Sequence, residues 1–597
     1  MKSKKSTIGK LLGSVREYKR ASILTPIFMI GEVVGECLIP YLMATKLLGH
    51  IEAVRLGAEL NMPFLIYWSA ILLLCGCASM LSGSIAGVTA SKAANGFGKN
   101  LRKDLYYAVQ DYSFKNIDNF QSSSLVTRLT TDVTNVQTSY MMVLRSAVRA
   151  PMMMIVSMIF AITIYPPIGW VYLAVVPFMF LALGFIMVKS VKIFQRIFKK
   201  YDALNASVQE NIKGMRVVKT YVREDFEKQK FNRSSEDVQR SFTRAERLIA
   251  FNNPIMSLAM YSTTTIILYI CANAGIRGNF DVANLSALIS YSAQLLMSFM
   301  MLSMIFVMIT ISVASAKRIV EVLEEKSTII NPENPIYEVK DGSIDFENVS
   351  FKYSETASRY ALSDVNLKIN SGETVGILGA TGSSKSTLVQ LLSRLYDTTE
   401  GSVKVGGVDV KDYDIKTLRD SVSVVLQKNV LFSGTIAENI RWGDKDASQE
   451  EVERVCKMGQ AHDFITSFPD GYDTFIEQGG TNVSGGQKQR LCIARALLKK
   501  PKILILDDST SAVDTRTDAM IRKAVAEEIP DTTKIIIAQR VASVMEADKI
   551  IVLENGAINA VGTHEELLAS NEIYRDVYES QNRAYGEGDF DKAEVNE

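Results

Sequence analysis

The sequence predicts an α-helical membrane domain of six transmembrane helices followed by an α/β domain. Long apolar runs fill the 597-residue chain before about residue 315, and ordinary globular composition follows from about residue 340. In the second part, an apolar strand, a glycine-containing loop and a helix follow one another over residues 375–395. This order is typical of a parallel sheet covered by helices. The formal net charge of +1 provides no basic field for nucleic acid, so no nucleic-acid partner is expected.

The first segment, residues 1–20, is basic and contains neither an apolar core nor a cleavage site, so it does not resemble a secretory signal. Ile8, Leu11, Leu12 and Val15 fall at helical spacing. The pattern predicts a short amphipathic helix lying on the cytoplasmic face of a membrane. A disordered basic tail is the alternative.

Six apolar runs approach the roughly 20 residues that a membrane span needs. They cover residues 22–48, 62–90, 138–163, 167–190, 248–273 and 283–311. Only Tyr165–Ile168 separates the third from the fourth, which predicts a tight hairpin. The two long stretches between spans are rich in Lys and Arg, whereas the short loops are nearly free of them. The positive-inside rule therefore places the long stretches, both termini and the second domain in the cytoplasm.

These boundaries predict a membrane domain over 21–320, a linker over 321–340, an α/β domain over 341–582 and a polar tail over 583–597. Within the first span, Glu32 and Glu36 share a helix face. Carboxylates at membrane depth either bind a cationic substrate or bond to a neighbouring helix, and both interpretations stay open. Met297, Met301 and Met304 in the sixth span suit a surface for varied apolar substrates, although methionine is also a common membrane filler.

The loop after strand 375–378 has the composition of a phosphate-binding loop. Backbone N–H groups and a helix N-terminus meet the phosphates in such loops. Lys385 would reach the β and γ phosphates, and Ser386 would bind Mg²⁺. The strict pattern has glycine at position 384, where this chain has Ser384. The expected nucleotide-binding residues of this loop are Gly379, Thr381, Gly382, Ser383, Ser384, Lys385, Ser386 and Thr387.

A second motif, Ser484-Gly485-Gly486-Gln487, precedes a predicted helix and is the most specific signal in the chain. A serine followed by two glycines at a helix start presents N–H groups and a hydroxyl to a phosphate. Downstream, Asp507 closes the apolar strand 502–506 and is expected to hold Mg²⁺ through water.

Six spans, two long cytoplasmic extensions and an ATP-binding domain together resemble the exporter class of ABC half-transporters, multidrug type, with fused membrane and P-loop ABC ATPase domains. Residues 120–133 and 210–219 resemble the first and second cytoplasmic loops of that class. The resemblance implies short coupling helices near 115–122 and 211–219, which transmit motion from the ATP domains.

The resemblance also implies the roles of single residues. Tyr353 would stack on adenine, although a tyrosine at a strand end is more often a packing residue. Gln427 would contact Mg²⁺ and the attacking water, and Asp514 would cross the dimer interface. Asp508 occupies the position of the glutamate that polarises water, and Gln539 that of the switch histidine.

These features imply a chain that binds ATP and Mg²⁺ but hydrolyses ATP slowly at its own site. The expected partner is a second, non-identical ABC half-transporter that carries Glu and His, in the bacterial plasma membrane. Its site would use this chain's Ser484–Gln487, and the pair would export small amphipathic compounds. A homodimeric lipid or drug flippase and an ATP-gated regulator or channel-like protein are the alternatives.

Overall fold

The computed structural model describes residues 7–55, 57–120, 122–278, 280–508 and 513–581. The chain divides into two compact units. The first contains Met1–Asp111 and Phe120–Lys326, and the second contains Tyr112–Asn119 and Ser327–Glu597. The division after Lys326 falls inside the predicted linker. Tyr112–Asn119, by contrast, lies within the predicted membrane domain but belongs to the second unit. The predicted tail 583–597 is outside the described residues.

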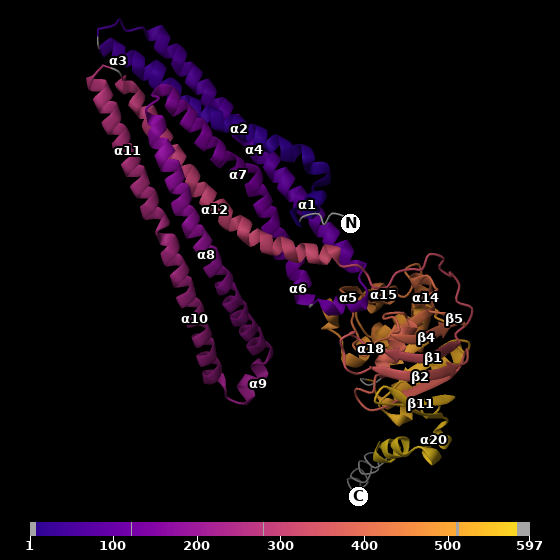
Figure 1. Cartoon of the computed structure of the whole chain (residues 1–597). Helices are drawn as coiled ribbons and strands as arrows, with labels where there is room; N and C mark the ends of the chain where they lie inside the picture. Colours follow the sequence, from indigo (N-terminus) through magenta and orange to yellow (C-terminus); the bar gives the residue numbers. More distant parts are fainter. Residues whose placement is uncertain (1–6, 56, 121, 279, 509–512, 582–597) are drawn as a thin grey trace. The chain divides into compact units, whose positions relative to one another are not determined.

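The first unit is helical, and its long helices run side by side (Figure 1). Six helical stretches in the described part of the chain are long and apolar enough to cross a membrane, which confirms the predicted number. The main helices are α2 (Lys19–Leu42), α4 (Met62–Gln110), α7 (Val133–Ile164), α8 (Ile168–Lys213), α10 (Glu224–Ala250), α11 (Asn252–Ile276) and α12 (Leu285–Glu324).

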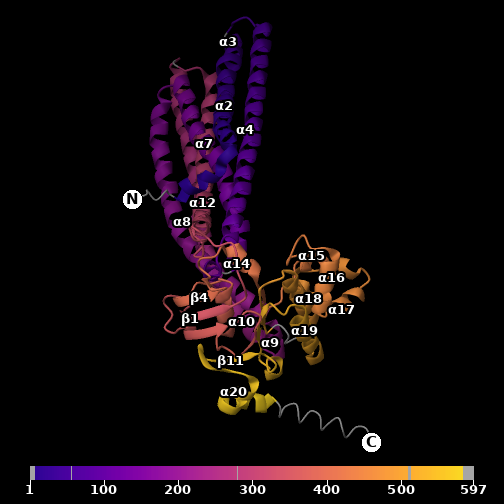
Figure 2. The same ribbon diagram turned by 90° about the vertical axis from the view of Figure 1, so that its right-hand side faces the viewer.

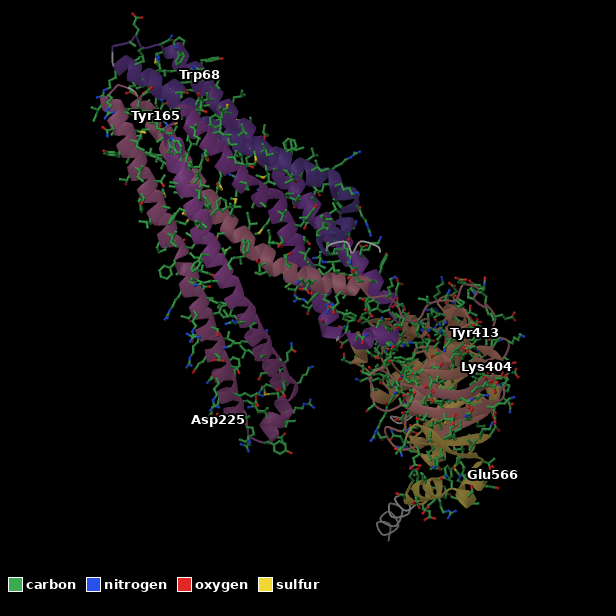
Figure 3. The ribbon with its side chains drawn as sticks, in the orientation of Figure 1. Trp68, Tyr165, Asp225, Lys404, Tyr413 and Glu566 are labelled. Carbon is green, nitrogen blue, oxygen red and sulfur yellow. The ribbon has the colours of Figure 1, made fainter. Side chains whose placement is uncertain are left out.

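The predicted hairpin between the third and fourth spans is present. α7 ends at Ile164 and α8 begins at Ile168, so the connection consists of Tyr165, Pro166 and Pro167. Figure 3 shows Tyr165 in this turn at one end of the helices and Asp225, near the start of α10, at the other end. α8 and α10 therefore extend well beyond the apolar part of their spans.

The N-terminal segment forms α1 (Thr7–Leu11) and a 3₁₀ segment, η1 (Leu12–Tyr18). Leu11 and Val15 are buried, whereas Leu12 is 48% exposed, as an amphipathic segment requires. Ser14 Oγ and Arg16 Nη2 donate to the Asp104 carboxylate at 2.8 and 2.7 Å. These bonds fix the segment to α4.

The second unit is built on a six-stranded sheet of order β12-β11-β3-β10-β9-β6, with a second sheet of order β2-β1-β4-β5. In the first sheet β11, β3, β10, β9 and β6 are parallel, and β12 is antiparallel to β11. All five residues of β9 are buried, as expected for a central strand covered on both faces. Figure 2 shows β1, β4 and β11 apart from a helical group that consists of α15 (Ile436–Ile440), α16 (Gln449–Met458), α17 (His462–Thr466) and α18 (Gly485–Leu498).

The strands of these two sheets are β1 (Ile344–Phe351), β2 (Leu362–Ile369), β3 (Thr374–Leu378), β4 (Glu400–Val405), β5 (Val408–Asp409), β6 (Val422–Val425), β9 (Ile503–Asp507), β10 (Thr533–Ile537), β11 (Lys549–Glu554) and β12 (Ala557–Gly562). The short strands β7 (Gly434–Thr435) and β8 (Phe475–Ile476) pair with each other in a third sheet. The helices that position the site are α5 (Phe114–Asn119), α13 (Lys385–Leu392), α18 (Gly485–Leu498) and α19 (Thr515–Glu528).

Candidate functional site

Four neighbouring parallel strands deliver most of the predicted site residues to one edge of the sheet. Gln427 follows β6, Asp508 follows β9, Gln539 follows β10, and the loop beginning at Gly379 follows β3. These strands are adjacent in the order β6-β9-β10-β3. Because the carboxyl ends of parallel strands share one edge, residues far apart in the sequence meet there.

The phosphate loop turns sharply from β3 into α13. Ser384 adopts the left-handed conformation, with φ 72° and ψ 23°, immediately before the helix. The strict motif has glycine here because glycine alone takes this conformation without strain. Lys385 Nζ donates to the carbonyl oxygens of Gly379 and Ala380 at 2.7 and 2.9 Å. Burial lowers the Lys385 pKa, and the Asp507 and Asp508 carboxylates oppose that shift.

The two residues best suited to hold Mg²⁺ are brought together. Asp507 ends β9 and is 5% exposed, and its carboxylate lies near enough to the Ser386 hydroxyl for that group to affect its pKa. Burial raises the Asp507 pKa, and the Ser386 hydroxyl opposes the rise. A hydroxyl and a carboxylate are oxygen ligands of the kind that Mg²⁺ prefers, so these residues fit the metal that the sequence implies.

Asp508 lies at the centre of a small polar network. The side-chain amides of Gln427 and Gln539 both donate to Asp508 Oδ2, at 3.2 and 2.8 Å. Gln489 Nε2 donates to the Asp508 backbone carbonyl at 3.4 Å. The backbone of Asp508 is also in the left-handed region, with φ 48°. The three residues predicted to carry hydrolysis therefore meet, with a short carboxylate and a neutral amide in place of glutamate and histidine.

Tyr353 lies just beyond β1 and is 45% exposed. Its hydroxyl is hydrogen-bonded to Thr387 Oγ1 at 2.8 Å, which places the ring beside the helix that follows the phosphate loop. The ring also makes edge contacts with Phe351 and Tyr396, at centroid distances of 4.9 and 5.2 Å. An exposed aromatic face beside a phosphate loop suits adenine stacking, which stays a prediction.

The second motif caps the N-terminus of α18. Ser484 Oγ accepts from the Gln487 N–H, and the Gln487 side chain accepts from the Ser484 N–H, which forms a capping box. Ser484 and Gly485 are exposed. Among the described residues, no hydrogen bond joins Ser484–Gln487 to Lys385 or Ser386. The motif therefore presents a helix N-terminus outward, as a surface offered to another molecule would.

Asp514 caps α19 by accepting from the Thr517 N–H at 2.9 Å, and this bond lowers the Asp514 pKa. Ser511 and Ala512, shortly before it in the chain, lie outside the described residues.

Short helices are present near both positions predicted for coupling helices, as α5 and α9 (Met215–Thr220), while their coupling role stays a prediction. α5 belongs to the second unit: the Tyr396 hydroxyl donates to Asp118 Oδ2 at 2.6 Å, and the Phe114 ring lies 6.1 Å from the Tyr396 ring. α9 connects α8 to α10 in the first unit, and Val217 within it and Tyr221 at its end are 59% and 72% exposed.

In the membrane-spanning helices, Glu32 and Glu36 share one cation. Arg149 of α7 pairs with Glu32 through Nη1, and with both oxygens of Glu36 through Nη2 at 2.8 Å. The pair of carboxylates therefore links α2 to α7. This contact favours the interhelical interpretation over a dedicated site for a cationic substrate. Met297 and Met304 on α12 are 68% and 63% exposed, and Met301 is partly buried.

The sequence interpretation missed Gln489 and Arg149. Gln489 is 1% exposed, and the signal for it was its position two residues after the end of the Ser484–Gln487 motif. Arg149 lies in the third apolar run, where an unpaired arginine would be costly. That cost is the signal that could have pointed to a carboxylate partner.

This geometry defines a multi-pass helical membrane protein fused to an ATP-binding domain. Residues 28–299 match the family described as the ABC transporter transmembrane region, and residues 362–511 match the family described as ABC transporter. The chain belongs to the ABC transporter family, in which ATP hydrolysis is coupled to transport.

Two relatives from Bacillus subtilis (strain 168) illustrate the match. The chain is 34% identical to the uncharacterized ABC transporter ATP-binding protein YfiB, over 96% of this chain and 98% of the relative. It is 37% identical to the putative multidrug export ATP-binding/permease protein YgaD, over 63% of this chain and 65% of the relative. The fold matches the structure of a bacterial Atm1-family ABC exporter with ATP bound, with a TM-score of 0.80, 23% identity and coverage of 94% and 98%.

Proposed function

We propose that this chain is one half of a heterodimeric ABC exporter that moves small amphipathic compounds out of a bacterial cell across the plasma membrane. Its own site holds ATP and Mg²⁺ but hydrolyses slowly, and a non-identical partner supplies the glutamate and histidine of the active site. The observation that carries this proposal is the network at the sheet edge, where Asp508 accepts from two amides, Gln427 and Gln539.

A slow site follows from the chemistry of these residues. A general base must come within about 2.6–3.2 Å of the proton it takes. Asp508 is one methylene shorter than the glutamate of the family, and a misplacement of about 1 Å can cost roughly 100-fold in rate. Gln539 forms hydrogen bonds but carries neither a proton for exchange nor a positive charge. Lys385, Ser386 and Asp507 are retained, so binding of Mg²⁺ and ATP is expected to persist.

Two exposed surfaces support a partner. The first is the N-terminus of α18, whose N–H groups and Ser484 hydroxyl suit the γ-phosphate of ATP held by another chain. The second is the apolar tip around α9, where Val217, Tyr221 and Phe226 are each at least 59% exposed. Exposed apolar patches of this kind mark interaction sites. The proposed partner would cover this tip.

The name of YgaD supports export of the multidrug type, and the excess of Lys and Arg in the long loops supports a cytoplasmic position for the ATP domain. The Glu32–Arg149–Glu36 contact and the methionines of α12 do not separate drugs from lipids. The substrate is therefore proposed only as amphipathic.

The test is to purify this chain alone and together with a related half-transporter encoded beside it, and then to reconstitute both samples in liposomes. We expect ATP-dependent efflux from the pair and little ATP hydrolysis by the lone chain. Full hydrolysis by the lone chain would contradict the heterodimer and favour a homodimeric flippase. An ATP-opened conductance without efflux would favour a channel-like protein.

Two substitutions in this chain, one for each composite ATP site, test whether the two sites of the assembled heterodimer differ. Ser484→Arg blocks the surface that this chain offers to the partner's ATP, so turnover should fall at least tenfold. Lys385→Ala damages the slow site, so it should reduce ATP retention more than it reduces the chemical step at the other site. Equal collapse of hydrolysis at both sites, measured by nucleotide trapping, would indicate two equivalent sites.

A further inference from the structure

The side chain of Asp508 forms its two described amide bonds through a single oxygen. Gln427 Nε2 and Gln539 Nε2 both donate to Oδ2, from loops that follow two different neighbours of β9. Gln427 follows β6 on one side, and Gln539 follows β10 on the other. Asp508 therefore ties together the two loops that flank its own strand.

We propose that Asp508 is a positioning residue that retains nucleotide, rather than the general base of this site. This inference rests on the proposed hydrolysis-impaired site and adds a role to it. A carboxylate oxygen that accepts two N–H bonds has its lone pairs directed at those donors. A general base needs such a lone pair directed at the attacking water. Oδ2 is therefore committed to the two amides and does not serve as the base.

The bond from Gln427 also orients the amide of the glutamine loop. Its nitrogen is held by Asp508, whereas its carbonyl oxygen accepts no hydrogen bond from the described residues. A carbonyl oxygen is the amide atom that a hard cation such as Mg²⁺ prefers. Asp508 therefore selects the orientation of Gln427 that suits the metal, and in this way acts on the nucleotide through Gln427.

The backbone of Asp508 is also held from two sides, which fixes the point from which its side chain starts. The Asp508 N–H donates to the Ile537 carbonyl at 2.9 Å, and the Asp508 carbonyl accepts from buried Gln489. Its left-handed φ of 48° is a conformation that aspartate tolerates better than most residues. A glutamate would move the carboxylate by about one C–C bond, ~1.5 Å, which is enough to break a 2.8 Å contact with Gln539. Asp508 and Gln539 therefore depend on each other and act as one unit.

The experiment compares Asp508→Asn with Asp508→Ala in the assembled, full-length transporter. The amide oxygen of asparagine accepts two N–H bonds in the place of Oδ2 but cannot act as a base, whereas alanine does neither. Retention is measured as the release of radiolabelled Mg²⁺–ATP after dilution into excess unlabelled ATP. We expect D508N to release nucleotide within about twofold of the unmodified protein and D508A about tenfold faster, the scale of one lost hydrogen bond to a charged group.

Gln539→Ala provides a second variant in case D508A folds poorly. It removes one donor and should speed release about fivefold, and the double variant D508A/Q539A should release no faster than D508A because Gln539 acts through Asp508. Multiplied effects in the double variant, or equal release from D508N and D508A, would overturn the proposal.

Hydrolysis at this site is read separately, with the catalytic glutamate of the partner replaced by glutamine to silence the other site. If slow ATP hydrolysis at this chain's site persists in D508N, the result supports a positioning role for Asp508. Its complete loss in D508N, with retention unchanged, would identify Asp508 as the base and overturn the inference. Efflux and total ATP turnover of the unmodified heterodimer test the proposed function itself. Failure of the proposed function can therefore be distinguished from failure of the inference about Asp508.

Discussion

Replacing Ser384 with glycine tests whether the unusual residue of the phosphate loop affects folding or binding. The left-handed conformation of Ser384, with φ 72°, costs a residue other than glycine about 1–2 kcal/mol. Glycine loses about 0.5–1 kcal/mol more backbone entropy on folding. Ser384→Gly should therefore increase the free energy of unfolding by about 0.5–1 kcal/mol. For a domain of this size, that corresponds to a rise in Tm of about 1–4 °C.

The strain at Ser384 lies in the turn that joins β3 to α13, so it is present in the folded protein both with and without nucleotide. Its removal should therefore change nucleotide affinity by less than about twofold. The assay combines thermal unfolding of the full-length protein in detergent with titration of ATP and Mg²⁺. Gln460→Gly is the matched control, because Gln460 also has a positive φ, 54°, but lies outside the phosphate loop. It should raise Tm similarly and leave affinity unchanged. A tenfold tighter binding of ATP by S384G without a change in Tm would refute this reasoning.

Three further predictions concern the other sites. Tyr353→Ala should weaken ATP binding by about 1–3 kcal/mol, which is the scale of base–aromatic stacking. Tyr353→Phe keeps the ring and should bind ATP nearly as well as the unmodified protein. Equal losses of ATP affinity in the two variants would contradict stacking. Because burial raises the Asp507 pKa, protonation should weaken Mg²⁺ binding at a less acidic pH than for an exposed aspartate, which a titration of Mg²⁺ affinity between pH 7 and 4 would show. Arg149→Met leaves Glu32 and Glu36 without their cation, so it should lower the free energy of unfolding of the helical unit by about 3–5 kcal/mol. The triple variant Arg149→Met, Glu32→Gln and Glu36→Gln should recover most of the thermal stability, because no charge is then left unpaired.

Local motifs could be predicted from the sequence because their function is encoded in a few consecutive residues. The strand, loop and helix around Lys385 and the helix cap at Ser484 have the predicted form, since backbone N–H groups and caps depend on local order. Contacts across the chain could not be predicted in this way. Arg149 is separated from Glu36 by 113 residues and from Glu32 by 117, and no spacing rule links them.

The membership of α5 in the second unit was also beyond the sequence. Residues 112–119 are enclosed by the predicted membrane domain, and composition gives no reason to separate them. Their assignment depends on tertiary contacts such as that between Tyr396 and Asp118. The convergence of Gln427 and Gln539 on Asp508 was expected from the family resemblance alone, because it depends on strand order, which sequence pattern does not specify.

The positions at which this chain departs from the family pattern support a specialised function rather than a general loss of activity. Ser384, Asp508 and Gln539 all follow the neighbouring strands β3, β9 and β10, and so belong to the site built on this chain's own phosphate loop. The outward-facing residues Ser484–Gln487 are complete, and Val483 directly before them is 9% exposed and packs in the core. A chain that had lost the need for ATP turnover would accumulate changes in both regions. Changes confined to one site, beside an intact surface for the other, are the pattern expected when one site retains nucleotide and the second hydrolyses it.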